Sequence, residues 1–254
     1  MTGLFDLMGK AALIVGGAGG IGRALSLGLA EYGADVIVAS RSLDHLEEVA
    51  KEIHALGRKT MAISVDITDE KSVADMVENI LKRFPRIDIL VNAAGVAIRR
   101  PADSFPIDEW QRVMDINARG TWLCCQVVGR VMLKQCSGKI INISSVSGRH
   151  GLPSGYAAYC PSKGAVDALT RTLACEWAKD NVLVNAIAPT FVETNLTRDV
   201  LANPDFAKTA KARIPLGRWA LAEDIVGPTV FFASKASDFI TGQVLYVDGG
   251  VTAW

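Results

Sequence analysis

Tyr159 and Lys163 are the residues of this chain whose types and spacing point most directly to chemistry. On a helix, residues i and i+4 share a face, so the phenol of Tyr159 and the ammonium of Lys163 are expected to lie close together. A free tyrosine has a pKa of about 10, and a nearby positive charge favours its ionised form. Such a tyrosine could exchange a proton with an alcohol or a ketone. The alternative is an interfacial aromatic residue beside a solvated lysine.

A second motif is the glycine cluster that follows the apolar run Ala11–Val15. Without side chains the backbone can approach a pyrophosphate, and the helix pattern that follows offers free N–H groups and the positive end of its dipole. The spacing therefore predicts a dinucleotide-binding turn, although a simple tight turn would show the same glycines. The residues expected to contact the cofactor here are Gly16, Gly19, Gly20, Ile21 and Gly22.

Short apolar runs alternate with longer amphipathic stretches along the whole chain. The runs, read as buried strands, are Ala11–Val15, Val36–Ala39, Thr60–Val65, Ile87–Val91, Lys139–Ile143, Val182–Ile187 and Val244–Val247. The helical patterns are Ile21–Tyr32, Leu43–Leu56, Glu70–Phe84, Ile107–Leu133, Tyr156–Lys179 and Ala222–Ala233. This alternation predicts an α/β fold: one doubly wound parallel sheet of about seven strands, with helices on both faces. No linker or repeat divides residues 1–254, so one domain is expected.

Ligands of such sheets gather at the carboxyl ends of the strands, and polar or small residues follow several of the predicted strands. Ser40 and Arg41 stand where the adenosine ribose is expected, and a cation without an acidic neighbour favours NADP over NAD. Arg41 could also be a solvated loop residue. The other expected cofactor contacts are Asp66, Ile67, Asn92, Ala93 and Gly95, with Asp66 alternatively a helix cap.

Composition excludes several classes of protein. The 27 basic and 27 acidic residues balance without forming blocks, so neither nucleic acid nor a membrane surface is an expected partner. No apolar run approaches the roughly 20 residues needed to cross a bilayer, and no signal peptide is visible. The five cysteines lack metal-binding spacing and are odd in number, which indicates reduced thiols, no metal site and a cytoplasmic protein.

Taken in order, these motifs resemble the short-chain dehydrogenase/reductase family over essentially the whole chain. The matching pieces are the glycine turn, Asn92-Ala93-Ala94-Gly95, Asn117, Ser145, the Tyr159/Lys163 pair, Pro189 with Thr194, and Val247-Asp248-Gly249-Gly250. The resemblance implies a Rossmann-type subunit with a catalytic tetrad. Ser145 would hydrogen-bond the substrate oxygen, Tyr159 would act as acid or base, Lys163 would lower the tyrosine pKa and hold the nicotinamide ribose, and Asn117 would bind a water. It also adds Tyr159, Lys163, Pro189, Val192 and Thr194 to the cofactor contacts.

Some positions leave the resemblance open. Ser144 competes with Ser145, and the preferred choice is Ser145 because it stands two residues before Ser147-Gly148. Asn117 could instead be a helix-interior amide bonded to backbone. The family's usual threonine before the first glycine is Val15 here, and the usual glycine after Pro189 is Thr190, which restricts the backbone there.

The substrate is expected under a mobile lid around residues 190–215. Candidate substrate contacts are Arg99, Arg100, Ser145, His150, Tyr159 and Asn195, where paired cations would suit a carboxylate. Leu4-Phe5-Asp6-Leu7, Glu176-Trp177-Ala178 and Ile214–Trp219 are similar to the gluconate 5-dehydrogenase branch of the family, which implies a sugar acid or polyol. A 3-ketoacyl thioester, a steroid-like ketone or an idle nucleotide-binding scaffold are the alternatives. Enoyl reductases, in which Tyr and Lys stand further apart, are disfavoured, and the resemblance implies a homotetramer.

Overall fold

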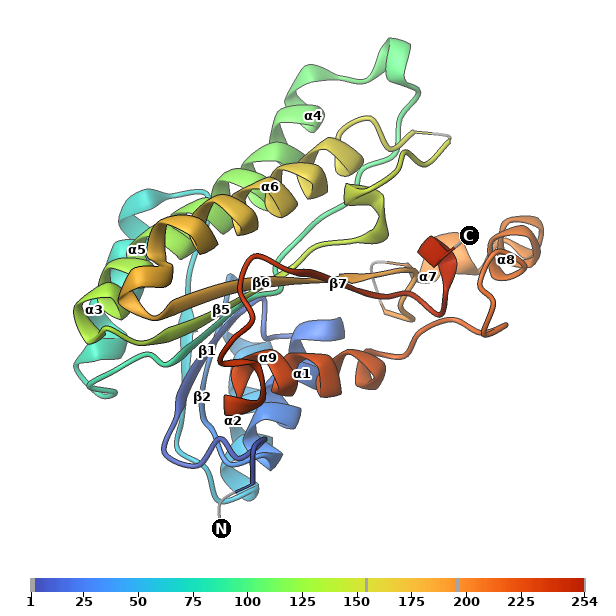
Figure 1. Cartoon of the computed structure of the whole chain (residues 1–254). Coiled ribbons are helices and arrows are strands. Elements are labelled where there is room, and N and C mark those ends of the chain that lie inside the picture. Colours follow the sequence, from blue (N-terminus) through green and yellow to red (C-terminus); the bar gives the residue numbers. More distant parts are fainter. Residues whose placement is uncertain (1–2, 154, 195–196, 254) are drawn as a thin grey trace.

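The computed structural model describes residues 3–153, 155–194 and 197–253, and places seven parallel strands in one twisted sheet (Figure 1). The strands are β1 Ala11–Val15, β2 Asp35–Ser40, β3 Thr60–Ser64, β4 Ile89–Asn92, β5 Gly138–Ile143, β6 Val182–Pro189 and β7 Val244–Val247. Their order in the sheet is β3-β2-β1-β4-β5-β6-β7. The order reverses between β1 and β4, which defines the crevice where such sheets bind ligands.

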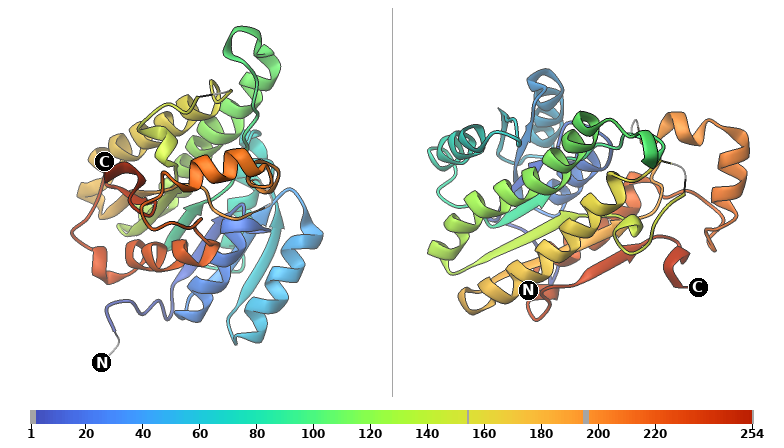
Figure 2. Two further views of the ribbon diagram at one scale, coloured as in Figure 1. Left: turned by 90° about the vertical axis from the view of Figure 1, so that its right-hand side faces the viewer. Right: turned by 90° about the horizontal axis from the view of Figure 1, so that it is seen from above.

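Helices cover both faces of the sheet (Figure 2). They are α1 Gly20–Glu31, α2 Leu43–Ala55, α3 Glu70–Leu81, α4 Ile107–Met114, α5 Thr121–Gln135, α6 Tyr159–Trp177, α7 Arg198–Leu201, α8 Pro204–Lys211 and α9 Val226–Ala233. Alternate side chains of each strand point to opposite faces. In β1, Leu13 packs in the core beneath α3, α5 and α6, whereas Ile14 packs in the core beneath α1, α2 and α9. Both faces of the sheet are therefore buried, as predicted, and this explains why the strand sequences are nearly continuous apolar runs.

The long helix predicted over Ile107–Leu133 is interrupted by a π-helical segment, Asp115–Gly120. Such segments widen the helix locally and often mark functional sites. The connection predicted as a lid contains the short helices α7 and α8, which the sequence patterns did not reveal.

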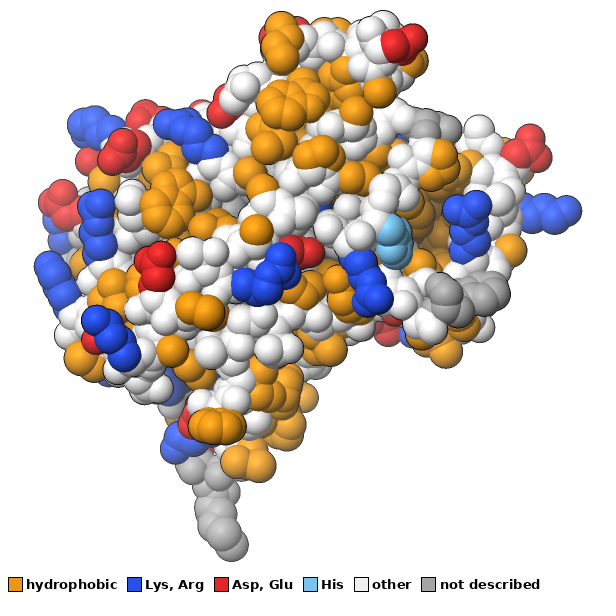
Figure 3. All heavy atoms as spheres, turned by 45° about the horizontal axis from the view of Figure 1, so that its top comes forward, with side chains coloured by type: hydrophobic (Ala, Val, Ile, Leu, Met, Phe, Trp, Pro, Cys, Tyr) orange, Lys and Arg blue, Asp and Glu red, His pale blue; other side chains and the backbone are white. Residues whose placement is uncertain are grey.

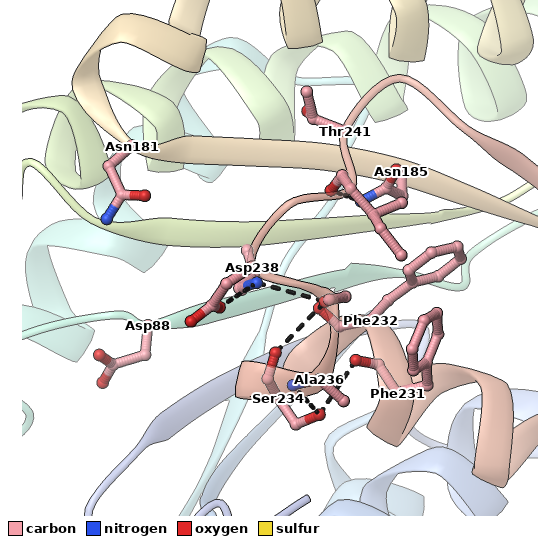
Figure 4. A network of polar contacts seen from close by, with 12 residues as sticks. Asp88, Asn181, Asn185, Phe231, Phe232, Ser234, Ala236, Asp238 and Thr241 are labelled. Carbon is pink, nitrogen blue, oxygen red and sulfur yellow. Dashed lines mark hydrogen bonds and ion pairs between the residues drawn. The ribbon is translucent and has the colours of Figure 1, made fainter. Parts of the chain in front are cut away.

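At the amino ends of the strands, a polar network fastens the segment before β7 to the sheet (Figure 4). Lys139 on β5 donates to Ser237 Oγ at 3.2 Å and to Asp238 Oδ1 at 2.8 Å. Asn185 on β6 donates to the carbonyl of Ile240 at 2.9 Å. These hydrogen bonds connect the elements at the amino ends of the strands. The open cavities described next lie at the carboxyl ends.

Candidate active site

The glycine turn between β1 and α1 has the geometry of an anion cradle. Gly16 and Gly20 have φ of 87° and 52°, which glycine adopts readily. A Cβ at Gly22 would lie 2.0 Å from the carbonyl oxygen of Gly16, so only glycine fits at this close approach. Gly19 precedes the helix in extended conformation, has no side-chain cap, and faces open space. The first N–H groups of α1 are thus directed toward a space that a phosphate could fill.

This turn opens into a cavity of about 750 Å³ at the carboxyl ends of β1 to β4. The cavity is elongated, because its lining residues run from Arg41 through the glycine turn to Gly95 and Thr194. Twelve predicted cofactor contacts line it: Gly16, Gly19, Gly20, Ile21, Gly22, Ser40, Arg41, Asp66, Ile67, Ala93, Gly95 and Thr194. The residues present therefore fit a dinucleotide.

Five predicted cofactor contacts are not among the residues that line this cavity: Asn92, Tyr159, Lys163, Pro189 and Val192. Asn92 is only 4% exposed and donates to Asn142 Oδ1 at 2.9 Å, because the two asparagines are register partners on β4 and β5. Pro189 is buried at the end of β6 beside Val247. Val192 packs in the core, where it forms a bridge with Ala220. The side chains of Asn92, Pro189 and Val192 pack inside the strand ends, and contact of these residues with the cofactor stays a prediction.

Sequence reasoning missed one wall of the cavity, which α4 and the start of the π-helical segment supply. Asp108, Gln111, Arg112 and Asp115 line it together. They recur at i, i+3, i+4 and i+7, so they share one helix face, and this spacing was the available signal.

At the adenosine end, Asp66 lines the cavity but does not cap α3, whose N-cap is Asp69. Its carboxylate accepts hydrogen bonds from the backbone N–H and hydroxyl of Thr68 at 2.9 and 2.7 Å, and these bonds lower its pKa. The nearby Arg41 lowers that pKa further. Arg41 is exposed, and no salt bridge within residues 3–153, 155–194 and 197–253 engages its guanidinium.

The proton-transfer residues meet where β5 ends and α6 begins. Tyr159 opens α6, and Ser145 lies just beyond β5; both line a second cavity of about 120 Å³. Ser145 is 7% exposed and its hydroxyl contacts Ser147 Oγ at 3.1 Å. Ser144 instead points inward, with its hydroxyl 3.4 Å from the carbonyl oxygen of Lys163. The structure thus places Ser145, and not Ser144, beside Tyr159 in the cavity wall.

Lys163 is buried one turn along α6 from Tyr159, on the same side of the helix. Its ammonium lies 5.8 Å from the centroid of the tyrosine ring and donates to the carbonyl of Ile143 at 2.8 Å. Burial lowers its pKa to about 8, and the charge of Asp167 opposes that shift.

Burial opposes the expected acidification of Tyr159. Burial raises the pKa of Tyr159 to about 12, although a hydrogen bond with Ser145 opposes the rise. The physical reason is that the phenol is withdrawn from water while the ammonium of Lys163 is directed to the Ile143 carbonyl. At neutral pH the site therefore presents a protonated phenol, the form needed to donate a proton to a carbonyl oxygen.

Asn117 lies in the π-helical segment and is fully buried. Its amide accepts from the Val96 N–H at 2.8 Å and donates to the Val96 carbonyl at 2.9 Å and to Ser162 Oγ at 3.0 Å. A Cβ built on Gly95 would lie 3.4 Å from Asn117 Oδ1 and 3.6 Å from Lys163 Nζ, so these two side chains face each other across Gly95. The structure brings all four tetrad residues to one region, with the Asn117 amide bonded internally.

Of the predicted substrate contacts, Arg99 joins Ser145 and Tyr159 in the wall of the small cavity. Its guanidinium lies 5.1 Å from the ring centroid of Tyr156 and 5.8 Å from that of Phe206 on α8. Arg100 turns away and pairs with Glu109 at 2.8 Å.

Two further predicted contacts fall elsewhere. His150 is exposed and lines neither cavity, because the turn after Ser145 carries it to the surface, and Asn195 lies outside the described residues. Contact of Arg100, His150 and Asn195 with a substrate stays a prediction.

The connection between β6 and α9 lies beside this small cavity. The ring of Phe191 packs edge-on against Phe206 and Trp219, with centroids 5.5 and 5.8 Å away. Thr190, Phe191 and Thr197 contribute to the cavity wall. The space-filling view shows a hollow on this side of the molecule with basic side chains at its rim (Figure 3).

Fold and site together define a nucleotide-binding oxidoreductase of the Rossmann class, and comparison with known proteins gives the family. Residues 16–252 match the family model described as "Enoyl-(Acyl carrier protein) reductase". The chain belongs to the short-chain dehydrogenase/reductase family, as predicted.

Curated relatives match over nearly their whole length. The chain is 41% identical over 250 residues to 2-dehydro-3-deoxy-D-gluconate 5-dehydrogenase of Dickeya dadantii, covering 97% of this chain and 96% of that protein. It is 39% identical over 249 residues to gluconate 5-dehydrogenase of Gluconobacter oxydans, covering 98% and 97%. A gluconate 5-dehydrogenase from Burkholderia cenocepacia, crystallised with NADP and tartrate, superposes with a TM-score of 0.96 at 36% identity, covering 100% of this chain and 99% of that one.

These findings confirm the predicted fold class and the predicted activity class, an NAD(P)-dependent oxidoreductase of alcohols and ketones. The family model's description names an enoyl reductase, whereas the relatives reported above are dehydrogenases. In the described part of the chain, no helix is both long and apolar enough to cross a bilayer.

Proposed function

We propose that this protein uses NADP to interconvert a secondary alcohol and a ketone on a sugar acid. The observation that carries the proposal is the placement of Ser145, Tyr159 and Arg99 in one small cavity, close to a large cavity that fits a dinucleotide. When bound, the nicotinamide supplies or accepts the hydride. The chain itself must orient the substrate, exclude water and move one proton.

Each tetrad residue has a role that its surroundings support. Ser145 orients the substrate oxygen through its hydroxyl, and Tyr159, whose pKa is raised by burial, donates the proton in the direction of reduction. Lys163 holds the nicotinamide ribose and supplies the nearby positive charge that stabilises phenolate. Asn117 fixes the backbone at Val96 and thereby the wall beside Lys163.

NADP is favoured over NAD by the residues at the adenosine end. Arg41 lines the cavity, and its guanidinium has no salt-bridge partner in the described part of the chain. The two residues that directly follow β2, Arg41 and Ser42, include no acidic side chain. A guanidinium binds a phosphate through charge-assisted hydrogen bonds. The solved Burkholderia relative was crystallised with NADP, in line with this reading.

Arg99 is the proposed anchor for the substrate carboxylate. Its guanidinium carbon lies 5.1 and 5.8 Å from the ring centroids of Tyr156 and Phe206, and these cation–π contacts position the cation at the cavity wall. The volume of about 120 Å³ favours a compact polar substrate over a long acyl chain or a steroid. The names of both curated relatives contain gluconate, which supports a sugar acid.

The decisive experiment is an absorbance assay of NADPH consumption over keto acids of sugars, 3-ketoacyl thioesters and 2-enoyl thioesters. Sugar keto acids are expected to be reduced fastest. Tyr159→Phe keeps the ring but removes the proton, and turnover should fall at least about 100-fold while NADPH still binds. Unchanged turnover in this variant would disprove the mechanism. Preferred turnover of the enoyl thioester would replace the proposal with enoyl reduction, and NADPH binding without any turnover would favour a scaffold.

We further propose a single domain that assembles as a homotetramer in the cytoplasm. All seven strands belong to one sheet, and apolar side chains remain exposed on α5 and on the edge strand β7, namely Trp122 and Leu245. The five cysteines form no disulfide, in line with a reducing compartment. Light scattering at micromolar concentration tests the assembly, and a monomer would refute it.

A further inference from the structure

A buried carboxyl group lies directly behind the proton-transfer residues and has no role in the mechanism described so far. Asp167 stands on α6 one turn beyond Lys163, and its side chain is only 4% exposed. Its Oδ1 has no hydrogen-bond partner among the described residues. A buried carboxylate oxygen without a partner is costly, so this position calls for a physical explanation.

The other carboxylate oxygen faces the loop that carries the catalytic serine. A Cβ at Gly148 would lie 2.5 Å from Asp167 Oδ2 and 3.0 Å from the carbonyl oxygen of Lys163. The Ser144 hydroxyl donates to that same carbonyl at 3.4 Å, and its proximity to the carboxylate lowers the pKa of Asp167. The loop that follows β5 is thereby packed against Asp167, with Ser145 next in the chain.

The charges around this carboxyl group are few. Two cations on α6 lower the pKa of Asp167: the buried Lys163, one turn before it, and the exposed Arg171, one turn after it. The loop contributes only the neutral Ser144 hydroxyl. Burial raises the pKa of Asp167, which these three groups oppose. In return, its negative charge opposes the burial that lowers the pKa of Lys163 to about 8.

We propose that Asp167 is a positioning residue, whose buried negative charge keeps Lys163, one turn away on α6, in its ammonium form and whose close packing against Gly148 holds the loop that carries Ser145. The inference rests on the proposed role of Lys163 in proton transfer. It explains why a carboxylate is retained where the surroundings do not satisfy both of its oxygens. The function is electrostatic, so it should be visible in the dependence of rate on pH.

The test compares wild type with Asp167→Asn, which keeps the size and polarity of the side chain and removes the charge. The readout is kcat/KM for ketone reduction by NADPH between pH 5.5 and 9.5. In the wild type, the Lys163 ammonium is fully present well below its pKa of about 8 and is lost as pH rises through that value, so the rate should fall there. Without the neighbouring charge, that limb should move to lower pH by about one unit. At pH 6 the two proteins should then differ by less than about threefold, near pH 8 by about fivefold, and at pH 9.5 by about tenfold.

Arg171→Gln is the matched control, because it removes an exposed charge from the same helix and should leave the limb within about 0.3 pH unit. Asp167→Ser is tested in parallel in case the amide does not fold, since it also removes the charge and keeps a polar group. Thermal unfolding confirms that each variant is folded. A loss of rate by the same factor at every pH, or an unmoved limb in a folded variant, would overturn the inference. Undiminished activity of Tyr159→Phe would instead overturn the proposed function, so the two failures are distinct.

Discussion

Replacing Gly22 by alanine tests whether the glycine turn is held together by close backbone contact. The new Cβ would lie 2.0 Å from the Gly16 carbonyl oxygen, 2.8 Å from the Gly16 carbonyl carbon and 3.2 Å from Gly17 Cα. All three atoms belong to the backbone, so no side chain can rotate away. Relief requires that α1 and the turn separate by more than about 1 Å, given normal contact distances of about 3.5 Å.

The expected cost follows from these distances. Overpacking of this kind costs about 3 kcal/mol at the upper end of its usual range. Alanine recovers about 1 kcal/mol through its higher helix propensity, because Gly22 is inside α1. A net loss of about 2 kcal/mol corresponds to a melting temperature lower by roughly 4–8 °C for a chain of this size.

Gly19→Ala is the matched control within the same turn. Its φ of −168° suits any residue, and a Cβ there meets nothing within 4 Å. Its effect on stability should therefore stay below about 1 kcal/mol, whereas NADPH binding should weaken about tenfold because the methyl group projects into the cavity. Thermal unfolding without cofactor and fluorescence titration with NADPH measure the two effects. If Gly22→Ala melted within about 2 °C of wild type, the reasoning from close contact would be wrong.

Three further predictions concern charged side chains. Arg41→Ala should lower kcat/KM with NADPH about 10–100-fold and leave the value with NADH nearly unchanged, because a charge-assisted bond to phosphate contributes roughly 1.5–3 kcal/mol; equal losses with both cofactors would refute this. Lys139→Met should cost less than about 1 kcal/mol in urea unfolding at pH 7, since burial lowers the pKa of Lys139 and its partner Asp238 is well exposed; a larger loss would show a net favourable pair. Asp224→Asn should destabilise the protein at neutral pH, because the bond with Arg218 lowers the pKa of Asp224 to about 2. The stabilisation by the Asp224 carboxylate is present above pH 3.8 and is lost as pH falls toward 2, so a difference in unfolding free energy that stayed constant over that interval would contradict the prediction.

Features governed by local chain geometry could be predicted from the sequence alone. The alternation of apolar runs and amphipathic stretches gives the parallel sheet, because strands and helices bury their side chains with different periods. The glycines of the turn and the four-residue spacing of Tyr159 and Lys163 belong to the same category, since each depends on a few consecutive residues. The structure accordingly has Gly16 in the turn between β1 and α1, and Tyr159 one helical turn before Lys163 on α6.

Other features depend on which distant segments pack together, and no local pattern contains that information. Asn92 is buried because β5 places Asn142 beside it as a hydrogen-bond partner. Arg100 forms an ion pair with Glu109 on α4. The π-helical turn around Asn117 fits its amide to Val96, and only the packed structure shows it.

Protonation was decided in the same way. The sequence predicts a lysine near a tyrosine, but the folded chain withdraws both groups from water and directs the ammonium to a backbone carbonyl. Burial then outweighs the attraction between neighbours and raises the pKa of Tyr159. The spacing along the chain therefore identified Tyr159 and Lys163 as a reactive pair. Their pKa values depend on burial, and burial is decided by all the segments that pack around them in the tertiary structure.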